Sequence, residues 1–217
     1  MSDDPLIARL KRLDVCAVSD ALDRLGLPPS VSGLVPQTIR GRIAGRATTV
    51  KFAAGAKVGG RHACTAAVEA GEPGGIVVVE QRTGVDAAGW GGILSRAAKA
   101  RRLSGAIVDG PARDIDEALE VGFPVFARSC TARTARGRIY EAETNGPVTI
   151  GEATVSPGDY LLADSSGVAF VTPADIERVL EAAEAIAARE AAMTADVEAG
   201  RPVSQVMGAS YETMLKA

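Results

Sequence analysis

Helical and strand-like patterns of apolar residues alternate through the first half of the chain. Apolar residues at helical spacing follow Asp14, which predicts a helix that Asp14 caps and that ends at Gly26. β-Branched and aromatic residues within 39–53 predict a half-buried strand, and small residues over 63–70 predict a short helix. The unbroken apolar run 76–79 is typical of a strand buried on both faces. This alternation indicates an α/β fold with a mixed sheet.

The second half has a different pattern, with short strands separated by turns and then one long helix. Strands are predicted over 125–127, 148–150, 160–163 and 168–171, and SPGD and DSSG are typical turn sequences. From Pro173 to about Gly200, apolar residues recur at helical spacing: Ile176, Val179, Leu180, Ala183 and Ile186. We expect an α/β domain over residues 1–172 and a helical extension over residues 173–217, which either reaches a neighbouring subunit or covers its own.

The composition suits an ordinary globular protein, since 47% of the 217 residues are hydrophobic and the formal net charge is −3. Arginines are scattered among acidic residues without a basic stripe, which argues against nucleic acid as a partner. No apolar run approaches the ~20 residues that span a bilayer, and the acidic N-terminus does not resemble a signal peptide. Three widely separated cysteines favour reduced, buried thiols. We therefore expect a cytoplasmic protein that binds neither nucleic acid nor membranes.

The segment 89–114 holds the residues best suited to bind a ligand; it reads GWGGILSRAAKARRLSGAIVDGPARD. It predicts a glycine-rich turn, a helix over about 92–101, a strand over 106–108 and a polar loop that contains Asp109, Arg113 and Asp114. A helix start offers unpaired N–H groups to an anion, an arginine pairs with a carboxylate, and carboxylates bind hard cations. If the helix and the strand fold as one hairpin, these groups meet and suit a small acid that chelates a metal.

A structural interpretation of the same residues stays open. An Arg-Asp pair in a loop is often a surface ion pair, and Asp114 stands where it could cap the following helix. Asp109 is expected to hold the loop by accepting backbone N–H bonds, and Trp90 is expected to pack in the core. The single histidine, His62, argues against a catalytic triad and against a zinc site with several histidines.

Three stretches, read in order, resemble a known family. They are the segment 89–114, EVGFPVFAR and VSPGDYLLADSSGVAFV, and the resemblance extends from the helix around Val18 to about Thr172. The family contains 4-hydroxy-4-methyl-2-oxoglutarate aldolases and the regulator of ribonuclease activity A. The resemblance implies an α/β fold, an αββα sandwich around a barrel-like mixed sheet with a C-terminal helical arm. It also implies homotrimers or homohexamers with sites between subunits.

The resemblance assigns roles to residues of the segment 89–114. In the aldolases of this family an arginine binds the carboxylate of the substrate, and the matching residue here is Arg113. The next aspartate holds Mg²⁺ or Mn²⁺, which makes Asp114 the expected metal ligand. Backbone amides at the helix start also hold the substrate, and they correspond to Ile93 and Leu94, which follow the turn formed by residues 91 and 92.

Two glycines in that turn, Gly91 and Gly92, complete the expected substrate-binding set. The aldolases carry an acid at the position of Gly92, where it positions a water for proton transfer, and the regulator branch lacks it. Residues 73–75 read Pro-Gly-Gly where the family favours Pro-Gly-Asp, a change that we expect to be structural. The aldolases also have a long C-terminal helix that supplies an acid to a neighbour's site. Glu190 is its best match, and an ordinary surface glutamate is the alternative.

The resemblance therefore implies a divalent-metal-dependent lyase of the class II pyruvate aldolase type that acts on a small 2-oxo acid. Retro-aldol cleavage to pyruvate and decarboxylation of oxaloacetate both pass through a metal-stabilised enolate. Because position 92 lacks an acid, we expect decarboxylation to survive better than aldol cleavage. The alternative is a non-catalytic regulator of ribonuclease activity that acts by protein–protein binding. The long C-terminal helix and the intact Arg-Asp pair favour the enzyme.

Overall fold

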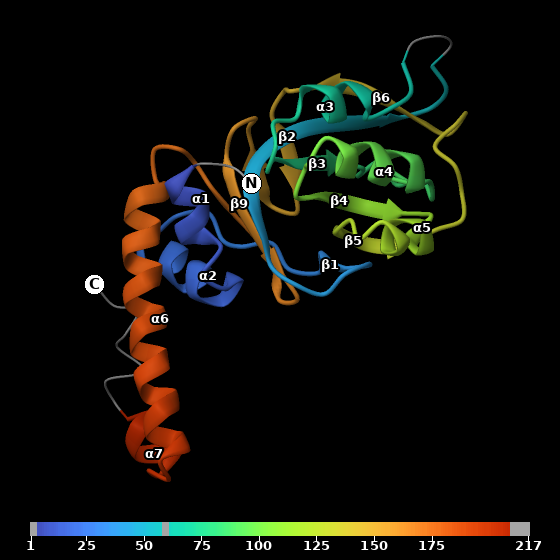
Figure 1. Ribbon diagram of the computed structural model, residues 1–217. Helices are drawn as coiled ribbons and strands as arrows, with labels where there is room; N and C mark the ends of the chain where they lie inside the picture. The colour runs from blue at the N-terminus through green and yellow to red at the C-terminus, as the bar shows by residue number, and fades with distance from the viewer. Residues whose placement is uncertain (1–3, 58–60, 209–217) are drawn as a thin grey trace.

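A mixed sheet runs through the centre of the molecule in the computed structural model, which describes residues 4–57 and 61–208 (Figure 1). Its order is β1-β5-β4-β3-β2-β9-β10, with β6 paired to β2, and the pairs β2–β3, β3–β4 and β4–β5 are parallel. The strands are β1 (Val35–Pro36), β2 (Ile43–Ala54), β3 (Ile76–Glu80), β4 (Gly105–Ala112), β5 (Val125–Cys130), β6 (Ile139–Thr144), β9 (Tyr160–Asp164) and β10 (Gly167–Val171). A separate hairpin joins β7 (Val148–Ile150) to β8 (Ala153–Val155).

The sheet is nearly closed into a barrel by the segment 31–36. Val31 bridges to Val168 on β10, and Val35 pairs with Ala127 on β5, so one short segment links the two ends of the strand order. The residue pattern predicts a mixed sheet and the family resemblance implies a barrel-like one, and the structure confirms both.

Two groups of helices cover opposite outer parts of this sheet. One group is α3 (Thr65–Ala70), α4 (Gly92–Ala100) and α5 (Ile115–Glu120), and the other is α1 (Pro5–Leu10), α2 (Val15–Arg24) and the start of α6 (Ile176–Glu198). Alternate residues of β3 show the layering: Ile76 and Val78 belong to the apolar cluster inside the barrel, while Val77 and Val79 pack toward α3–α5. The run 76–79 is therefore buried on both faces, as predicted.

The predicted helix after Asp14 is confirmed as α2, with the Asp14 carboxylate accepting the Ala17 N–H at 2.8 Å. The expectation of buried thiols is correct for Cys64 only, because Cys16 and Cys130 are exposed; all three are free. None of the described helices combines the length and the apolar character needed to cross a membrane.

The long helix α6 packs on the domain along only its first half. Its buried residues are the five apolar ones predicted from the sequence, and the last of them is Ile186. Beyond that point α6 runs away from the sheet and carries α7 (Val203–Val206) near its end (Figure 1). We call residues 187–208 the distal arm.

Candidate functional site

The glycine-rich turn before α4 lies against the end of β4, as a helix–strand hairpin requires. The Gly89 N–H donates to the Pro111 carbonyl at 2.9 Å, and the Arg113 N–H donates to the Trp90 carbonyl at 3.0 Å. Trp90 also forms a parallel bridge with Ala112. These bonds bring the start of α4 beside the Arg113–Asp114 dipeptide.

Trp90 is a packing residue, and its contacts in the core hold this arrangement in place. Its side chain is buried and stacks on Phe123 with ring centroids 6.1 Å apart. Its Nε1–H donates to Ser95 Oγ at 2.9 Å, which ties the indole to the first turn of α4. The helix start is therefore anchored in the core.

Asp114 occupies the position before α5 but does not cap that helix with its side chain. Its backbone is left-handed, with φ 56° and ψ 42°. The carboxylate turns toward α4 instead: Oδ2 accepts the Gly92 N–H at 3.0 Å and the Arg113 Nε–H at 3.1 Å. Oδ1 has no hydrogen-bond partner among the described residues. Strained backbone that local contacts hold in place is concentrated at functional sites.

Donors for an anion surround this carboxylate. The N–H groups of Ile93 and Leu94 find no acceptor within residues 4–57 and 61–208, as is usual in the first turn of a helix. Arg113 uses only Nε in its bond to Asp114, and its side chain is about one-third exposed, so its terminal nitrogens stay available. An unpaired helix start and a guanidinium together form a site for a carboxylate.

A pocket of about 170 Å³ opens over these groups, and we call it the Arg113–Asp114 pocket. The six residues expected from the sequence line it together: Gly91, Gly92, Ile93, Leu94, Arg113 and Asp114. The sequence did not predict other lining residues from distant parts of the chain, which include Phe52 on β2 and, from loops, His62, Thr134, Ala135 and Arg136. Tertiary packing brings these residues to the pocket, and no pattern in the neighbouring sequence predicts their positions.

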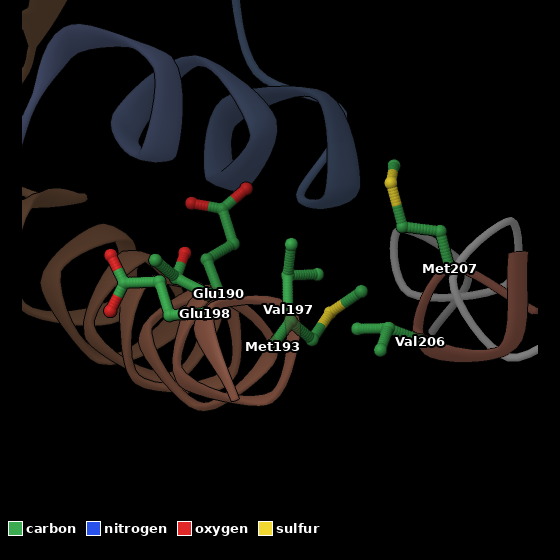
Figure 2. A pocket seen from close by; sticks show the side chains of 7 residues that line it. Glu190, Met193, Val197, Glu198, Val206 and Met207 are labelled. Carbon is green, nitrogen blue, oxygen red and sulfur yellow. The ribbon is translucent and has the colours of Figure 1, made fainter. Parts of the chain in front are cut away.

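Glu190 lies elsewhere in the same chain. It is on α6, on the side of the molecule that carries α1 and α2, and not among the residues that line the Arg113–Asp114 pocket (Figure 1). Burial, together with the carboxylates of Asp14 and Asp20, raises the pKa of Glu190. Glu190 lines a groove on α6, and Figure 2 shows its carboxylate directed toward the neighbouring N-terminal helical ribbon, drawn in blue. A role at a site of this kind would have to be in a neighbouring copy.

The distal arm carries a second, larger groove of about 340 Å³. In Figure 2, Met193 and Val197 on α6 face Val206 and Met207 across it. Val197 and Met207 are exposed apolar side chains. Among its lining residues within 4–57 and 61–208, the groove brings no arginine, lysine or histidine together with its acids, so this part of it lacks the chemistry of the smaller pocket.

Asp109 has a structural role. It is buried and accepts hydrogen bonds from Arg128 Nε at 2.7 Å and from the Gly151 N–H at 2.6 Å. It thus holds the turn between β7 and β8, and not the loop that follows its own strand. Asp114 is left as the carboxylate available to a cation in the pocket.

Comparisons with known proteins match most of this sequence to a known family. The model of the RraA-like family, described as Aldolase/RraA, matches residues 15–170. A protein of Halalkalibacterium halodurans, provisionally named 4-hydroxy-4-methyl-2-oxoglutarate aldolase, is 28% identical over 178 residues, covering 82% of this chain and 81% of its own. Protein DlpA of Legionella pneumophila is 24% identical over 201 residues, and the match covers 92% of this chain but only 33% of that protein.

A solved structure shares the fold over nearly the whole chain. It is an uncharacterised protein of Pseudomonas syringae pv. tomato, with a TM-score of 0.84 and 26% sequence identity over 94% of this chain and 97% of that one. The match to the family model covers most of the sequence and includes every element that builds the pocket. This chain therefore belongs to the RraA-like family.

Proposed function

We propose that this chain is a divalent-metal-dependent lyase that releases pyruvate from a small 2-oxo acid, by retro-aldol cleavage, by decarboxylation of oxaloacetate, or by both. One observation carries the proposal: three complementary groups share one wall of one pocket. They are the Arg113 guanidinium, the Asp114 carboxylate and the unpaired N–H groups at the start of α4. The names of relatives as aldolases support the same class of reaction.

The residues of the pocket fit Mg²⁺ or Mn²⁺ held largely by substrate and water. Among the described residues there is no group of three or more His, Cys, Asp or Glu side chains placed to hold a metal. Mg²⁺ commonly keeps several waters and binds through one or two carboxylates, and Asp114 offers one oxygen without a protein partner. When bound, such a cation supplies Lewis-acid polarisation of the 2-oxo group.

The chain's own groups bind and orient the acid. The terminal nitrogens of Arg113 suit the C1 carboxylate, since a guanidinium matches a carboxylate with two parallel hydrogen bonds. The N–H groups of Ile93 and Leu94 point from the positive end of α4. They would stabilise the negative charge that develops on the substrate oxygen when the bond between C3 and C4 breaks.

The test is pyruvate release from oxaloacetate. Purified protein with Mn²⁺ is expected to form pyruvate faster than the same Mn²⁺ concentration without protein, followed by a lactate dehydrogenase-coupled assay. The metal-only sample is necessary because free Mn²⁺ itself promotes the decarboxylation. A rate no higher than that control, in the presence of folded protein, would contradict the proposal.

We also propose that the chain assembles into a homotrimer or homohexamer in which the distal arm contacts a neighbouring copy. The exposed apolar residues of the arm support this, since Val197, Val203 and Met207 are 42%, 57% and 46% exposed in the single chain. Glu190 would then reach the vicinity of another copy's pocket.

The same groove favours a second candidate function, a regulator of ribonuclease activity that acts by protein–protein binding. An uncovered apolar groove is typical of a protein interface. This alternative predicts that Arg113→Ala leaves the function intact and that a ribonuclease co-purifies with the chain. A regulator that acts by protein–protein binding would not need the Arg113–Asp114 pocket. We therefore prefer the lyase as the proposed function.

A further inference from the structure

A second carboxylate lies at the start of α4 beside Asp114. It belongs to Glu117, three residues later on α5. A Cβ placed on Gly92 would be 2.7 Å from Glu117 Cδ, still closer to Glu117 Oε2, and 3.1 Å from Asp114 Cβ. Real Cβ atoms do not make contacts as short as the first two, so the Glu117 carboxylate fills the volume that a side chain at position 92 would need.

Glu117 is not committed to a strong ion pair. Its nearest basic partner is Arg96, with Nε 3.8 Å from Glu117 Oε2, while Arg96 Nη2 makes a shorter contact of 2.9 Å with Glu120. The Glu117 side chain is about half exposed, and no hydrogen bond to its carboxylate is found in the described part of the chain. Glu117 therefore packs against Gly92 with its carboxylate open to solvent.

We propose that Glu117 carries the proton to and from C3 of the 2-oxo acid in the Arg113–Asp114 pocket, an inference that rests on the proposed function. When the bond between C3 and C4 breaks, its electron pair stays on C3 as an enolate. The Glu117 carboxylic acid then gives its proton to C3, a C–H bond forms, and pyruvate and the Glu117 carboxylate remain. Solvent returns a proton to the carboxylate. In the reverse direction the carboxylate removes a methyl proton from pyruvate.

Glu117 is not among the residues that line the pocket, but its carboxylate packs against Gly92, which is one of them. An acid held by the N–H groups of Ile93 and Leu94 lies over the first turn of α4. Gly92 has no side chain to separate that turn from the Glu117 carboxylate. The Asp114 Oδ2 atom is already engaged by Gly92 and Arg113, so Asp114 is the poorer proton carrier.

His62 is the competing candidate because it lines the pocket directly, whereas Glu117 contacts a lining residue, Gly92. It comes from the loop before α3, and its Nδ1 lies 3.0 Å from the carbonyl oxygen of its neighbour Ala63. The imidazole therefore bonds locally, whereas Glu117 packs against the helix start that would hold the acid. The experiment includes both residues for this reason.

The test separates proton transfer from bond cleavage. With Mn²⁺ in D₂O, exchange of the pyruvate methyl protons is followed by proton NMR, and oxaloacetate loss is measured in parallel. Glu117→Gln is expected to slow the exchange by roughly 100-fold or more, the usual contribution of a positioned acid or base. Oxaloacetate loss should fall by a smaller factor, because an enolate can be protonated by water after cleavage. Binding of oxalate, which has no proton to transfer, should change less than about twofold by calorimetry.

Two further variants control for structural effects. Glu120→Gln removes the other carboxylate that contacts Arg96 and should leave both rates unchanged. Gly92→Ala adds the Cβ that collides with Glu117 and should lower the exchange rate as Glu117→Gln does. Equal exchange in Glu117→Gln and wild type, or loss of exchange in His62→Gln alone, would overturn the inference while the lyase proposal stands. If wild type neither exchanges nor decarboxylates, the proposed function fails and this inference fails with it.

Discussion

Asp114 shows at the scale of one residue how the site differs from an ordinary loop. A left-handed backbone costs a residue with a side chain roughly 1 kcal/mol or more. A simple helix cap would not need that conformation, and the Asp114 side chain does not cap α5. The conformation instead points the carboxylate at the Gly92 N–H and at Arg113. The structure therefore excludes the cap of α5, and it shows the ion pair with Arg113 as part of a cluster at the start of α4.

Arg113 gives the sharpest prediction at this scale. Arg113→Ala is expected to lower kcat/KM for oxaloacetate by roughly 10- to 100-fold, since a hydrogen-bonded charge pair contributes about 1.5–3 kcal/mol. Arg113→Lys should recover only part of this, because an ammonium lacks the guanidinium's paired donors. Arg136→Ala removes another arginine that lines the Arg113–Asp114 pocket, and it is the control variant for Arg113→Ala. If Arg113→Ala and wild type had the same kcat/KM, Arg113 would not bind the substrate carboxylate.

The sequence predicts the core residues of the pocket because they belong to one local hairpin. Glu117 was also within reach of sequence reasoning, since an acid three residues after Asp114 on a helix shares its face. His62 and Arg136 were not, because their loops reach the pocket only through the packing of β2 and β6 on the rest of the sheet.

At the scale of elements, buried segments were easier to predict than edge segments. The sequence predicts α2, β3, β7 and the start of α4 closely because each has a continuous or periodic apolar pattern. It misses β6, whose residues IYEAET pair with β2 while most of their side chains stay partly exposed. It also misses α1 and β8, which are short. Those elements depend on neighbours far away in the sequence for their stability.

The contact between α1 and α6 predicts that the free energy of unfolding depends on pH. Arg9 Nε and Nη2 donate to the two Glu184 oxygens at 2.8 and 2.7 Å, and this bond to Arg9 holds the pKa of Glu184 below its usual value. The stabilisation is therefore present above about pH 4.5 and is lost as the pH falls through the folded-state pKa. Because both side chains are about a third or more exposed, Glu184→Gln should cost at most about 1 kcal/mol.

Urea unfolding at pH 7 and at pH 3 checks this prediction. The free energy of unfolding of Glu184→Gln should lie below that of wild type at pH 7 and approach it at pH 3. Glu181→Gln removes the same charge from α6 without removing a hydrogen bond to Arg9 and is the control. An equal difference at both pH values would show that the ion pair is not its source.

At the scale of the whole molecule, closure of the barrel and the direction of the arm are both long-range features. The short segment 31–36 closes the sheet by contacts with β5 and β10, and the local sequence gives no sign of them. The distal arm extends from the domain with apolar side chains uncovered (Figure 1). The resemblance to a family led to the expectation of a barrel-like sheet, whereas the residue pattern itself predicted the long C-terminal helix.

The proposed assembly predicts that charges in the arm groove change the oligomeric state. Val197→Glu combined with Met207→Glu should lower the molar mass measured by light scattering during size-exclusion chromatography. Both side chains are exposed in the single chain, so the fold of each subunit should persist by circular dichroism. Ile39→Glu changes an exposed apolar residue outside the arm and should leave the mass unchanged. An unchanged mass for the double variant would exclude the groove as a subunit contact.

In the proposed function, Asp114 holds the cation on which lyase activity depends. The rate of Mn²⁺-dependent pyruvate release from oxaloacetate, compared between wild type and Asp114→Asn, tests it most directly. Asparagine tolerates the left-handed backbone, so the variant should fold, and Asp116→Asn on α5, the helix that follows Asp114, is the control. We predict that Asp114→Asn falls to the metal-only rate while Asp116→Asn retains activity. A folded Asp114→Asn variant with the wild-type rate would contradict the claim.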